Sequence, residues 1–503
     1  MNLASVIDGH PESATAVIGG DGRTTYGELR AQVAALRGGL ARLGVNIDDR
    51  VAIVSNNDVS FVLTYLAVLG LGAVTVPLNP ASPARELERE LATVSPKVVV
   101  VGPGGAETFG EVDLAAAGGS VEHVINATQV AVPGAEPLRP LLEGDPAAVV
   151  ERQADDLAVL IFTAGTSGSP RAAMLTHGNL LANVQQVQRH PGRAVGPDDV
   201  SLGVLPMFHI FGLNVMLGLA LLAGASVVLS ERFHASSALR DIAEHGVTMM
   251  AGPPTMYAAL AALPEADRHA LATVRFAASG AAPLSAEVAA AFESRFGIPL
   301  REGYGLTEAS PVITSSVMDA PPKPGSIGVP IPGVEVRLVD DDGEDSLLGD
   351  AGELWARGPN IFPGYWHDEA STADSLTSDG WLRTGDIAVA GDDGELYLVD
   401  RAKDLIIVSG FNVFPAEVEE ALRQHPAVAE VAVVGVTHAY TGETVHAYVV
   451  LADGAGASEA ELIEHCARQL ARYKCPTEVI VVPSLPHGLT GKLLRRALRQ
   501  APG

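Results

Sequence analysis

The sequence predicts an α/β protein with a large N-terminal region of two stacked α/β subdomains and a small β-barrel, followed by a small α+β C-terminal domain. At 503 residues, the chain is too long for a single hydrophobic core. Apolar helices alternate with short Val/Ile/Leu strands before Gly352, which is typical of parallel sheets covered on both faces. The expected domains are 1–400 and 404–503, with the boundary between them at 401–403.

The first elements follow from hydrophobic periodicity. Apolar residues recur every three or four positions across residues 25–43, which predicts an amphipathic helix capped at Thr24 or Thr25. The next elements are a strand over 50–54, a helix over 59–69 and, after a glycine turn, a strand over 73–77.

A helix–glycine–strand unit occurs twice, at residues 66–78 and 219–230. Either a duplication gave two related α/β layers, or this is the general habit of α/β units. The second copy lies in an uncharged stretch, residues 210–230, which is long enough to cross a membrane. Glycines and polar residues interrupt this stretch and no Lys/Arg cluster flanks it. A buried helix, a glycine turn and a buried strand therefore explain it better.

The C-terminal part is predicted from a change in pattern. Segments such as GELWARG, GYW and GELYLVDR alternate in polarity between glycine and aspartate turns, which is typical of a small β-barrel or a twisted antiparallel sheet. After residue 404, helices and strands alternate in a module of ordinary domain size. Its expected elements are helices over 415–424 and 458–471 and strands over 428–436 and 443–451.

Charge and cysteine content exclude several classes of protein. The formal net charge is −27, from 60 acidic and 33 basic residues, which argues against binding to nucleic acid or anionic lipid. A polyanionic ligand would need a local device such as a loop of backbone N–H groups. Cys466 and Cys475 offer no disulfide framework, and residues 1–10 lack the features of a secretory signal. We therefore expect a cytoplasmic protein in a reducing compartment.

Three segments are candidates for chemistry. The first, FTAGTSGSPR at residues 162–171, follows an apolar strand over 157–162 and precedes a helix that starts near Thr176. Its small residues and two glycines would let backbone N–H groups converge on a phosphate, although the pattern is not a Walker A loop. A flexible Gly/Ser turn is the alternative.

The other two segments say less on their own. LREGYGLTE, residues 300–308, places Tyr304 between two glycines for packing against a flat ligand, and Thr307 and Glu308 offer oxygens for phosphate and Mg²⁺. An ordinary strand-end turn with a buried tyrosine is the alternative. In LPHGLTGK, residues 485–492, Lys492 at a glycine turn is by itself typical of a solvated surface charge.

Taken together, these segments resemble the ANL superfamily of adenylate-forming enzymes, in order and spacing and over nearly the whole chain. Within the superfamily, the pattern is most similar to bacterial medium- and long-chain fatty acyl-CoA synthetases. Seven motifs carry the resemblance: FTAGTSGSPRAAMLTH (162–177), LPMFHIFG (205–212), ASGAAPL (278–284), EGYGLTE (302–308), WLRTGD (381–386), DRAKDLIIVSGFNVFP (400–415) and LPHGLTGK (485–492).

The phosphate loop departs from the superfamily pattern. Ala164, Ser167, Arg171 and Ala172 stand where the superfamily usually has Ser, Thr, Lys and Gly. Most of the cradle is backbone, and Arg171 keeps the cation as a planar fork instead of a point charge. We therefore expect a changed affinity for nucleotide and a retained reaction.

The resemblance implies the use of ATP, Mg²⁺ and coenzyme A, and it assigns roles in adenylate formation. Lys492 would bridge the substrate carboxylate and the α-phosphate, Glu308 would hold Mg²⁺, and Tyr304 would stack on adenine. The remaining assignments are Thr163, Gly165, Thr166, Ser167, Gly168 and Arg171 for the β- and γ-phosphates, Thr307 for phosphate, Gly280, Ala281, Ala282, Glu302, Gly303 and Gly305 around adenine, and Asp386 with Arg401 for the ribose.

For transfer to the thiol, the resemblance implies a mobile C-terminal domain that swings about a hinge at Lys403. The swing would remove Lys492 from the site. It would bring in Ser409, Gly410 and Phe411 to line a tunnel for the pantetheine arm.

The resemblance places His209 beside the acyl carbonyl, although a lone histidine between apolar neighbours is more often a core residue. The expected acyl pocket has no obvious cation for a second carboxylate, so an apolar tail is favoured over a dicarboxylate. The pocket residues are Ile210, Phe211, Asn214, Ala251, Gly252, Gly280, Gly305 and Val312.

The predicted function is therefore ATP-dependent activation of a carboxylic acid, with a fatty acid preferred, and transfer to coenzyme A. The alternatives are an acyl-AMP ligase that loads the phosphopantetheine of a carrier protein, an aryl- or short-chain-acyl-CoA ligase, a luciferase-like oxidase, and a non-catalytic homologue. The expected partners are the acid, ATP and coenzyme A, with no nucleic acid and no membrane span. The sequence leaves open whether the protein forms a homodimer.

Overall fold

A computed structural model describes residues 1–503 apart from 21, 164–170, 193–194, 265, 317–319, 341, 402–405, 409–410, 414, 439–441, 471, 488–492, 494 and 500–503. The chain forms two compact units. The first consists of Met1–Pro324, Gly328–Glu335 and Ala356–Leu382, and the second of Gly325–Ile327, Val336–Trp355 and Arg383–Gly503. The domain boundary expected at 401–403 is a hinge between moving domains, and it stays a prediction.

The first unit contains a mostly parallel sheet. β3, β4, β5, β6, β7 and β8 pair in parallel, whereas β9 is antiparallel to β8 and β19 to β9. Helices α3 (Ala84–Val94) and α4 (Ala106–Phe109) pack Leu87, Leu91 and Phe109 against it. The strand order is β19 (Gly364–Tyr365), β9 (Arg171–Thr176), β8 (Leu157–Thr163), β4 (Val74–Leu78), β3 (Arg50–Val54), β5 (Val98–Val101), β6 (His123–Asn126) and β7 (Glu136–Pro137).

A second sheet of the first unit is also parallel in its interior. Its strands run in the order β15 (Val312–Ser315), β14 (Arg301–Gly305), β13 (Phe276–Ser279), β12 (Met249–Gly252), β10 (Val200–Gly203), β11 (Ser226–Leu229), β1 (Thr15–Gly19) and β2 (Gly22–Thr25). Only β15 and β2 are antiparallel to their neighbours among these strands. Helices α7 (Ala235–His245), α8 (Pro254–Ala262) and α9 (Ala286–Phe296) pack on one face, where Tyr257 meets Phe292 edge to face.

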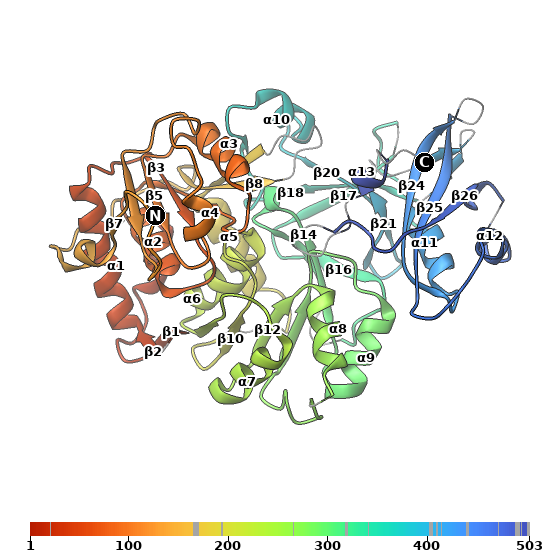
Figure 1. The fold of residues 1–503 in the computed structure, drawn as a ribbon, viewed down its shortest axis with the longest axis horizontal. Helices are drawn as coiled ribbons and strands as arrows, with labels where there is room; N and C mark the ends of the chain where they lie inside the picture. The colour runs from red at the N-terminus through yellow and green to blue at the C-terminus, as the bar shows by residue number, and fades with distance from the viewer. Residues whose placement is uncertain are drawn as a thin grey trace. The chain divides into compact units, whose positions relative to one another are not determined.

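A layer of helices joins the two sheets of this unit. α5 (His177–Gln188) contacts β9 of the first sheet and α6 (Leu219–Ala223) contacts β11 of the second, and the two helices contact each other. Figure 1 shows both helices between the strands of the two sheets. α2 (Val59–Gly70) is buried from Phe61 to Gly70, as expected for a helix covered on all sides.

Several predicted elements of the first unit are confirmed. α1 (Tyr26–Arg42) begins at the Thr25 capping box, and α2 and β4 occupy the expected positions. The uncharged stretch forms a π-helix, η3 (Phe211–Gly218), then α6, a left-handed turn at Gly224 and β11. Both predicted helix–glycine–strand units are therefore present, the first as α2 and β4 and the second as α6 and β11. No helix in the described part of the chain is long and apolar enough to span a membrane.

The second unit contains two β structures. The strands β17 (Glu335–Val339), β18 (Gly352–Arg357), β20 (Leu382–Ala390) and β21 (Leu396–Arg401) are neighbours in that order. The C-terminal sheet has the order β23 (Phe411–Val413), β22 (Ile406–Val408), β25 (Gly442–Leu451) and β24 (Val428–His438), with β26 (Glu478–Val481) paired to β25.

The C-terminal sheet is covered on both faces, because successive side chains along β24 point to opposite sides. Val431 and Val433 pack with α11 (Pro415–Arg423) and α12 (Glu459–Ala467). Ala432 and Val434 join a separate cluster that includes Leu498 of α13 (Arg495–Arg499). The expected α/β fold with a smaller α+β C-terminal domain is thus confirmed.

The prediction lacked several strands, among them β9 and β26. β9 lies between the glycine-rich loop and the helix that follows it, so the loop leads into a strand. α5 starts at His177 with Thr176 as its N-cap, which confirms the predicted start near Thr176. β26 was not predicted, and α12 ends at Ala467, earlier than residue 471.

Candidate active site

The glycine-rich loop is held at both ends by an antiparallel pair of strands. Thr163 ends β8 and Arg171 begins β9, and the two residues are direct cross-strand partners. The Thr163 hydroxyl donates a hydrogen bond of 3.5 Å to the Arg171 carbonyl. The predicted phosphate-binding residues Gly165, Thr166, Ser167 and Gly168 lie outside the described residues. The structure therefore places the two ends of the loop.

Arg171 and Glu308 meet at a third residue, Tyr365, which the sequence did not single out. The guanidinium carbon of Arg171 lies 4.7 Å from the centre of the Tyr365 ring. The Tyr365 hydroxyl donates a hydrogen bond of 2.6 Å to Oε1 of Glu308. Arg171 Nε is buried and has no hydrogen-bond partner among the described residues. A buried unpaired donor is costly unless a ligand satisfies it, so this atom fits a phosphate oxygen.

The missed tyrosine has a weak sequence signal. The GYW segment predicts only a short strand, and Tyr365 does lie in the short strand β19. Gly364 has φ +141°, and a Cβ there would lie 2.5 Å from the Thr372 methyl group. A glycine that cannot be replaced marks a crowded turn, but it does not reveal which residue the next side chain reaches.

The segments predicted to surround adenine lie at the carboxyl ends of adjacent parallel strands. Ser279 at the end of β13 pairs with Glu302 in β14, so Gly280 to Ala282 leave the sheet beside Glu302 to Gly305. Ala281 has a left-handed backbone, with φ +68°. Ligands of α/β sheets bind at such strand ends. The structure therefore brings these two motifs together.

Glu302 ties the two motifs to each other. Its Oε1 accepts a hydrogen bond of 3.1 Å from the Leu284 N–H, and its side chain is buried. Burial raises the pKa of Glu302 to about 7, although the hydrogen bond from Leu284 acts in the opposite direction.

The turn after β14 is packed tightly around Gly305. A Cβ at this position would lie 1.9 Å from the carbonyl oxygen of Pro311, so only glycine fits. The following 3₁₀ turn, η4 (Thr307–Ala309), carries both predicted phosphate and metal residues. Thr307 is buried, and the Glu308 carbonyl accepts a hydrogen bond of 2.9 Å from the Phe362 N–H.

His209 lies two residues before Phe211, the first residue of the π-helix. Its Nδ1 accepts a hydrogen bond of 3.2 Å from the Phe211 N–H, so the neutral ring carries its proton on Nε2. The Phe211 ring lies against Gly280, where a Cβ would be 3.2 Å from it. The Asn214 amide donates to the carbonyls of Leu180 and Ser310.

The predicted ribose-binding residues are neighbours in the second unit. Asp386 in β20 is the cross-strand partner of Arg401 in β21. Asp386 is buried, and its N–H donates a hydrogen bond of 3.1 Å to the Thr384 hydroxyl. The backbone thus brings this predicted pair together.

The remaining predicted residues of the second unit are placed only in part. Phe411 begins β23, opposite Val408 of β22. Lys403, Ser409, Gly410 and Lys492 lie outside the described residues, so their roles stay predictions.

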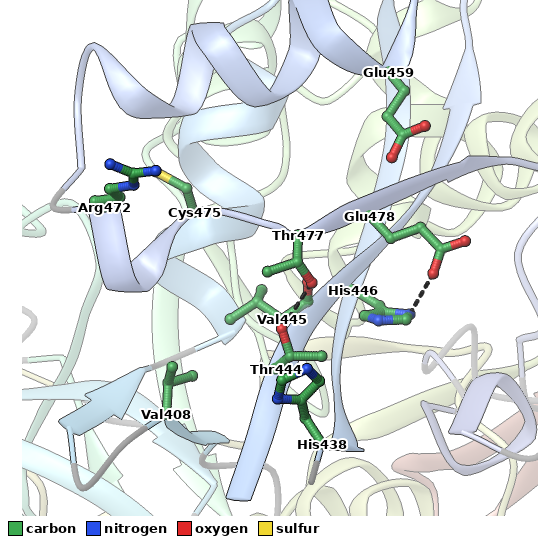
Figure 2. A pocket seen from close by; sticks show the side chains of 10 residues that line it. All are labelled: Val408, His438, Thr444, Val445, His446, Glu459, Arg472, Cys475, Thr477 and Glu478. Atoms are coloured by element: carbon green, nitrogen blue, oxygen red, sulfur yellow. Dashed lines mark hydrogen bonds and ion pairs between the residues drawn. The ribbon is translucent and has the colours of Figure 1, made fainter. Parts of the chain in front are cut away.

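A cavity of about 500 Å³ lies in the C-terminal sheet region, and none of the predicted site residues lines it. Figure 2 shows His446 facing Glu478, with 3.2 Å between Nδ1 and Oε2, and Thr444 facing Thr477. Burial raises the pKa of the Cys475 thiol, which is therefore a poor nucleophile at neutral pH. The cavity is lined by polar and apolar side chains, and its one thiol, that of Cys475, is unreactive.

A metal ion would have few protein ligands among the residues that the structure describes. Among the described residues, no three His, Cys, Asp or Glu side chains gather as a metal site. Glu308 is a single carboxylate, with one oxygen bound to Tyr365. That arrangement fits Mg²⁺, which usually takes one or two carboxylates together with substrate phosphates and water.

Family models match both parts of the chain. The AMP-binding enzyme model matches residues 3–366, and the AMP-binding enzyme C-terminal domain model matches residues 417–492. The chain belongs to the AMP-binding enzyme family. The resemblance to adenylate-forming enzymes is thereby confirmed, and the family is one of acid–thiol ligases.

Relatives of this AMP-binding enzyme include CoA ligases for different acids. It is 37% identical to a long-chain-fatty-acid–CoA ligase of Yersinia pestis, over 93% of this chain and 88% of the relative. It is 36% identical to 4-coumarate–CoA ligase 2 of Oryza sativa subsp. japonica, over 97% and 90%.

Solved structures of the family have the same fold as this AMP-binding enzyme. ATP-bound MatB from Rhodopseudomonas palustris matches with a TM-score of 0.92 at 33% identity, covering 99% of each chain. A benzoate CoA ligase from Burkholderia xenovorans LB400 matches with a TM-score of 0.88 at 27% identity, covering 99% of this chain and 100% of that one.

Proposed function

We propose that this AMP-binding enzyme is a fatty acyl-CoA synthetase, which activates a fatty acid as its acyl-adenylate and transfers the acyl group to coenzyme A. The observation that carries the proposal is the meeting of Arg171 and Glu308 at Tyr365, next to the end of the glycine-rich loop. A buried guanidinium nitrogen that lacks a partner among the described residues, close to a carboxylate, suits a metal–triphosphate ligand.

In the first half-reaction, a carboxylate oxygen of the acid attacks the α-phosphorus of ATP. The bond from that phosphorus to the bridging oxygen breaks, and pyrophosphate leaves with the electron pair. Two anions must approach each other, so the protein's main contribution is positive charge and alignment. Arg171 would bind the leaving phosphates, and Lys492 would bridge the carboxylate and the α-phosphate.

Glu308 would hold Mg²⁺, which when bound supplies neutralisation of phosphate charge. Thr307 would bind a phosphate oxygen through its hydroxyl. The segments that carry Gly280 to Ala282 and Glu302 to Gly305 would enclose adenine, with Tyr304 stacked on its face. The shared strand ends of β13 and β14 support this assignment.

In the second half-reaction, the thiol sulfur of coenzyme A attacks the acyl carbonyl carbon. The bond to the adenylate oxygen breaks, AMP leaves, and the thiol proton passes to solvent. We propose that the segment 401–403 is the hinge for this step and that Ser409, Gly410 and Phe411 line the path of the thiol. Asp386 and Arg401 would hold the ribose in the first step.

An apolar acyl chain is supported by the residues around His209. Ile210 is buried and Phe211 lies against Gly280, so this wall offers hydrocarbon and an aromatic ring. Relatives named for long-chain fatty acids support a fatty acid as the substrate.

An aryl acid is the second candidate, because the Phe211 ring would stack on an aromatic substrate. Relatives named for 4-coumarate and a structure named for benzoate support this alternative. Both candidates use the same adenylation chemistry and differ only in the acyl pocket.

A substrate panel tests the proposal. Purified protein is given ATP, Mg²⁺ and coenzyme A with acids from acetate to long-chain fatty acids, and with 4-coumarate and benzoate, while AMP release is measured. We expect the largest kcat/KM for a fatty acid. A larger kcat/KM for an aryl acid would select the second candidate, and no AMP release with any acid would reject both.

The acceptor and the cellular site complete the proposal. A parallel assay with a phosphopantetheine-bearing carrier protein would separate coenzyme A ligation from carrier loading. We propose a cytoplasmic enzyme, in line with the two buried free cysteines. Whether it forms a homodimer is measured directly by light scattering of the purified protein.

A further inference from the structure

Tyr365 belongs to a short segment that is attached to both sides of the proposed phosphate site. At one end, the Phe362 N–H donates to the Glu308 carbonyl, at 2.9 Å. At the other end, the Trp366 N–H donates to the Ala172 carbonyl, at 2.8 Å, next to Arg171. The segment 362–366 therefore connects the turn that carries Glu308 with the strand that carries Arg171.

The Tyr365 ring is fixed within this segment. Its backbone N–H donates to the Thr372 hydroxyl, at 2.9 Å, and its ring meets Phe362 edge to face at 4.9 Å. The side chain is 5% exposed. Thr372 is itself held in α10 (Glu369–Ser375), so the ring has little freedom to turn.

Arg171 and Glu308 carry opposite charges in a partly buried site, where attraction is stronger than in water. A direct ion pair would occupy both groups. In the part of the chain that the structure describes, both side chains contact Tyr365 instead and no ion pair joins them. The guanidinium meets the ring, and the carboxylate accepts from the hydroxyl.

The Tyr365 hydroxyl is the donor in its hydrogen bond of 2.6 Å to Oε1 of Glu308. The hydrogen bond orients Oε1 of the carboxylate, and Arg171 keeps its buried Nε without a partner among the described residues.

We propose that Tyr365 is a positioning residue for adenylation, which holds the Glu308 carboxylate and the Arg171 guanidinium in separate places, one for the metal and one for phosphate. This inference rests on the proposed function, because it assumes that a metal–nucleotide complex binds here. It assigns a task to the hydroxyl that the packing of the ring alone does not require.

Tyr365→Phe removes the hydroxyl and keeps the ring. The probe is Mn²⁺ with a non-hydrolysable ATP analogue, and free Mn²⁺ is measured by electron paramagnetic resonance. We expect Mn²⁺ binding to weaken roughly tenfold, as for the loss of a hydrogen bond to a charged group. We also expect ATP–pyrophosphate exchange to need correspondingly more Mg²⁺, with the kcat at saturating Mg²⁺ recovering toward that of the wild type.

The matched control is Tyr26→Phe, which removes another buried hydroxyl, one that donates to the Ala225 carbonyl at 2.9 Å. This control should change the thermal unfolding midpoint about as much as Tyr365→Phe does, but not Mn²⁺ binding. Tyr365→Leu also removes the ring face, so we expect it to weaken binding of the metal-free analogue as well.

Unchanged Mn²⁺ binding and unchanged Mg²⁺ dependence in Tyr365→Phe would overturn the inference, whatever the stability of the variant. A wild-type protein that binds no Mn²⁺–nucleotide complex would overturn it too. A wild type that binds the complex but activates no acid would reject the proposed function alone, and Mn²⁺ binding by the variant would still decide the role of Tyr365.

Discussion

The carboxyl group of Glu302 lies where β13 and β14 end, and burial controls its charge. Its pKa is raised to about 7 in the folded protein, from 4.5 for an ordinary glutamate. Between these two values the folded state holds a proton that the unfolded state has released. Stability therefore falls as the pH rises through this window, and the full loss, about 3 kcal/mol, is reached above it.

Glu302→Gln should remove this dependence, because glutamine stays neutral and similar in size. We expect the thermal unfolding midpoint of the variant, relative to the wild type, to be higher at pH 8 than at pH 5. Thermal unfolding of both proteins across this pH range checks the prediction. A constant difference between them would show that the carboxyl group keeps an ordinary pKa.

A second residue-scale prediction concerns the crowded turn after β14. In Gly305→Ala, the new Cβ would meet the Pro311 carbonyl at 1.9 Å, so the backbone must move. We expect a loss of about 3 kcal/mol of stability, at the upper end for overpacking. Gly303→Ala is the control, since its Cβ would lie 3.4 Å from the Thr314 carbonyl. Equal shifts in the unfolding midpoint would contradict this explanation.

At the scale of elements, one side chain of the π-helix η3 connects it to two neighbouring segments. The Asn214 amide donates to the carbonyls of Leu180, at 3.0 Å, and Ser310, at 2.7 Å. These bonds join η3 to α5 and to the turn after η4. π-Helices are rare and often lie at functional sites, where specific contacts maintain them.

Asn214→Ala leaves two buried carbonyls without this donor. We expect a loss of roughly 2–4 kcal/mol of stability. We also expect a slower ATP–pyrophosphate exchange, because His209 lies just before the same helix. Asn46→Ala is the control, since the exposed Asn46 amide donates only to the Gly44 carbonyl among the described residues. If both variants melt at the same temperature, the amide does not stabilise the π-helix.

The elements that could be predicted from the sequence are those whose signals are local. α1 has its capping box at Thr25 and an apolar face, and β24 has side chains for two cores in alternation. The pairing of β9 with β8 and of β26 with β25 depends on residues elsewhere in the chain. The π-helix has the same apolar pattern as an α-helix, so periodicity could not distinguish them.

The candidate site also contains residues that the sequence could predict and one that it could not. Arg171 and Glu308 belong to motifs that the resemblance covers. Tyr365 joins them only because β19 pairs with β9, so that three segments far apart in the sequence come together. No single-sequence pattern contains such a contact.

At the scale of the whole molecule, the two half-reactions are expected to use different residues of the C-terminal domain. Lys492, which lies outside the described residues, should serve only the first. Lys492→Ala should lower ATP–pyrophosphate exchange by at least about a hundredfold, the effect of removing one charge-stabilising group. Thioester formation from preformed acyl-adenylate should stay near the wild-type rate. Both steps should also stay near the wild-type rate in the control Lys97→Ala, which removes a half-buried lysine paired with Asp49 and Glu122. Equal loss of both steps in Lys492→Ala would contradict the two-role model.

The ladder between β8 and β9 has a further consequence for how the proposed phosphate-binding loop can vary. Because Thr163 and Arg171 are paired across the ladder, the strands fix the distance that the intervening seven residues must span. A change of composition or length between them would alter the ligand that the loop binds. Arg171, at the far end of the loop, would keep its position in the sheet. Nucleotide preference could therefore evolve, or be engineered, inside this hairpin without dismantling the charge arrangement that surrounds it.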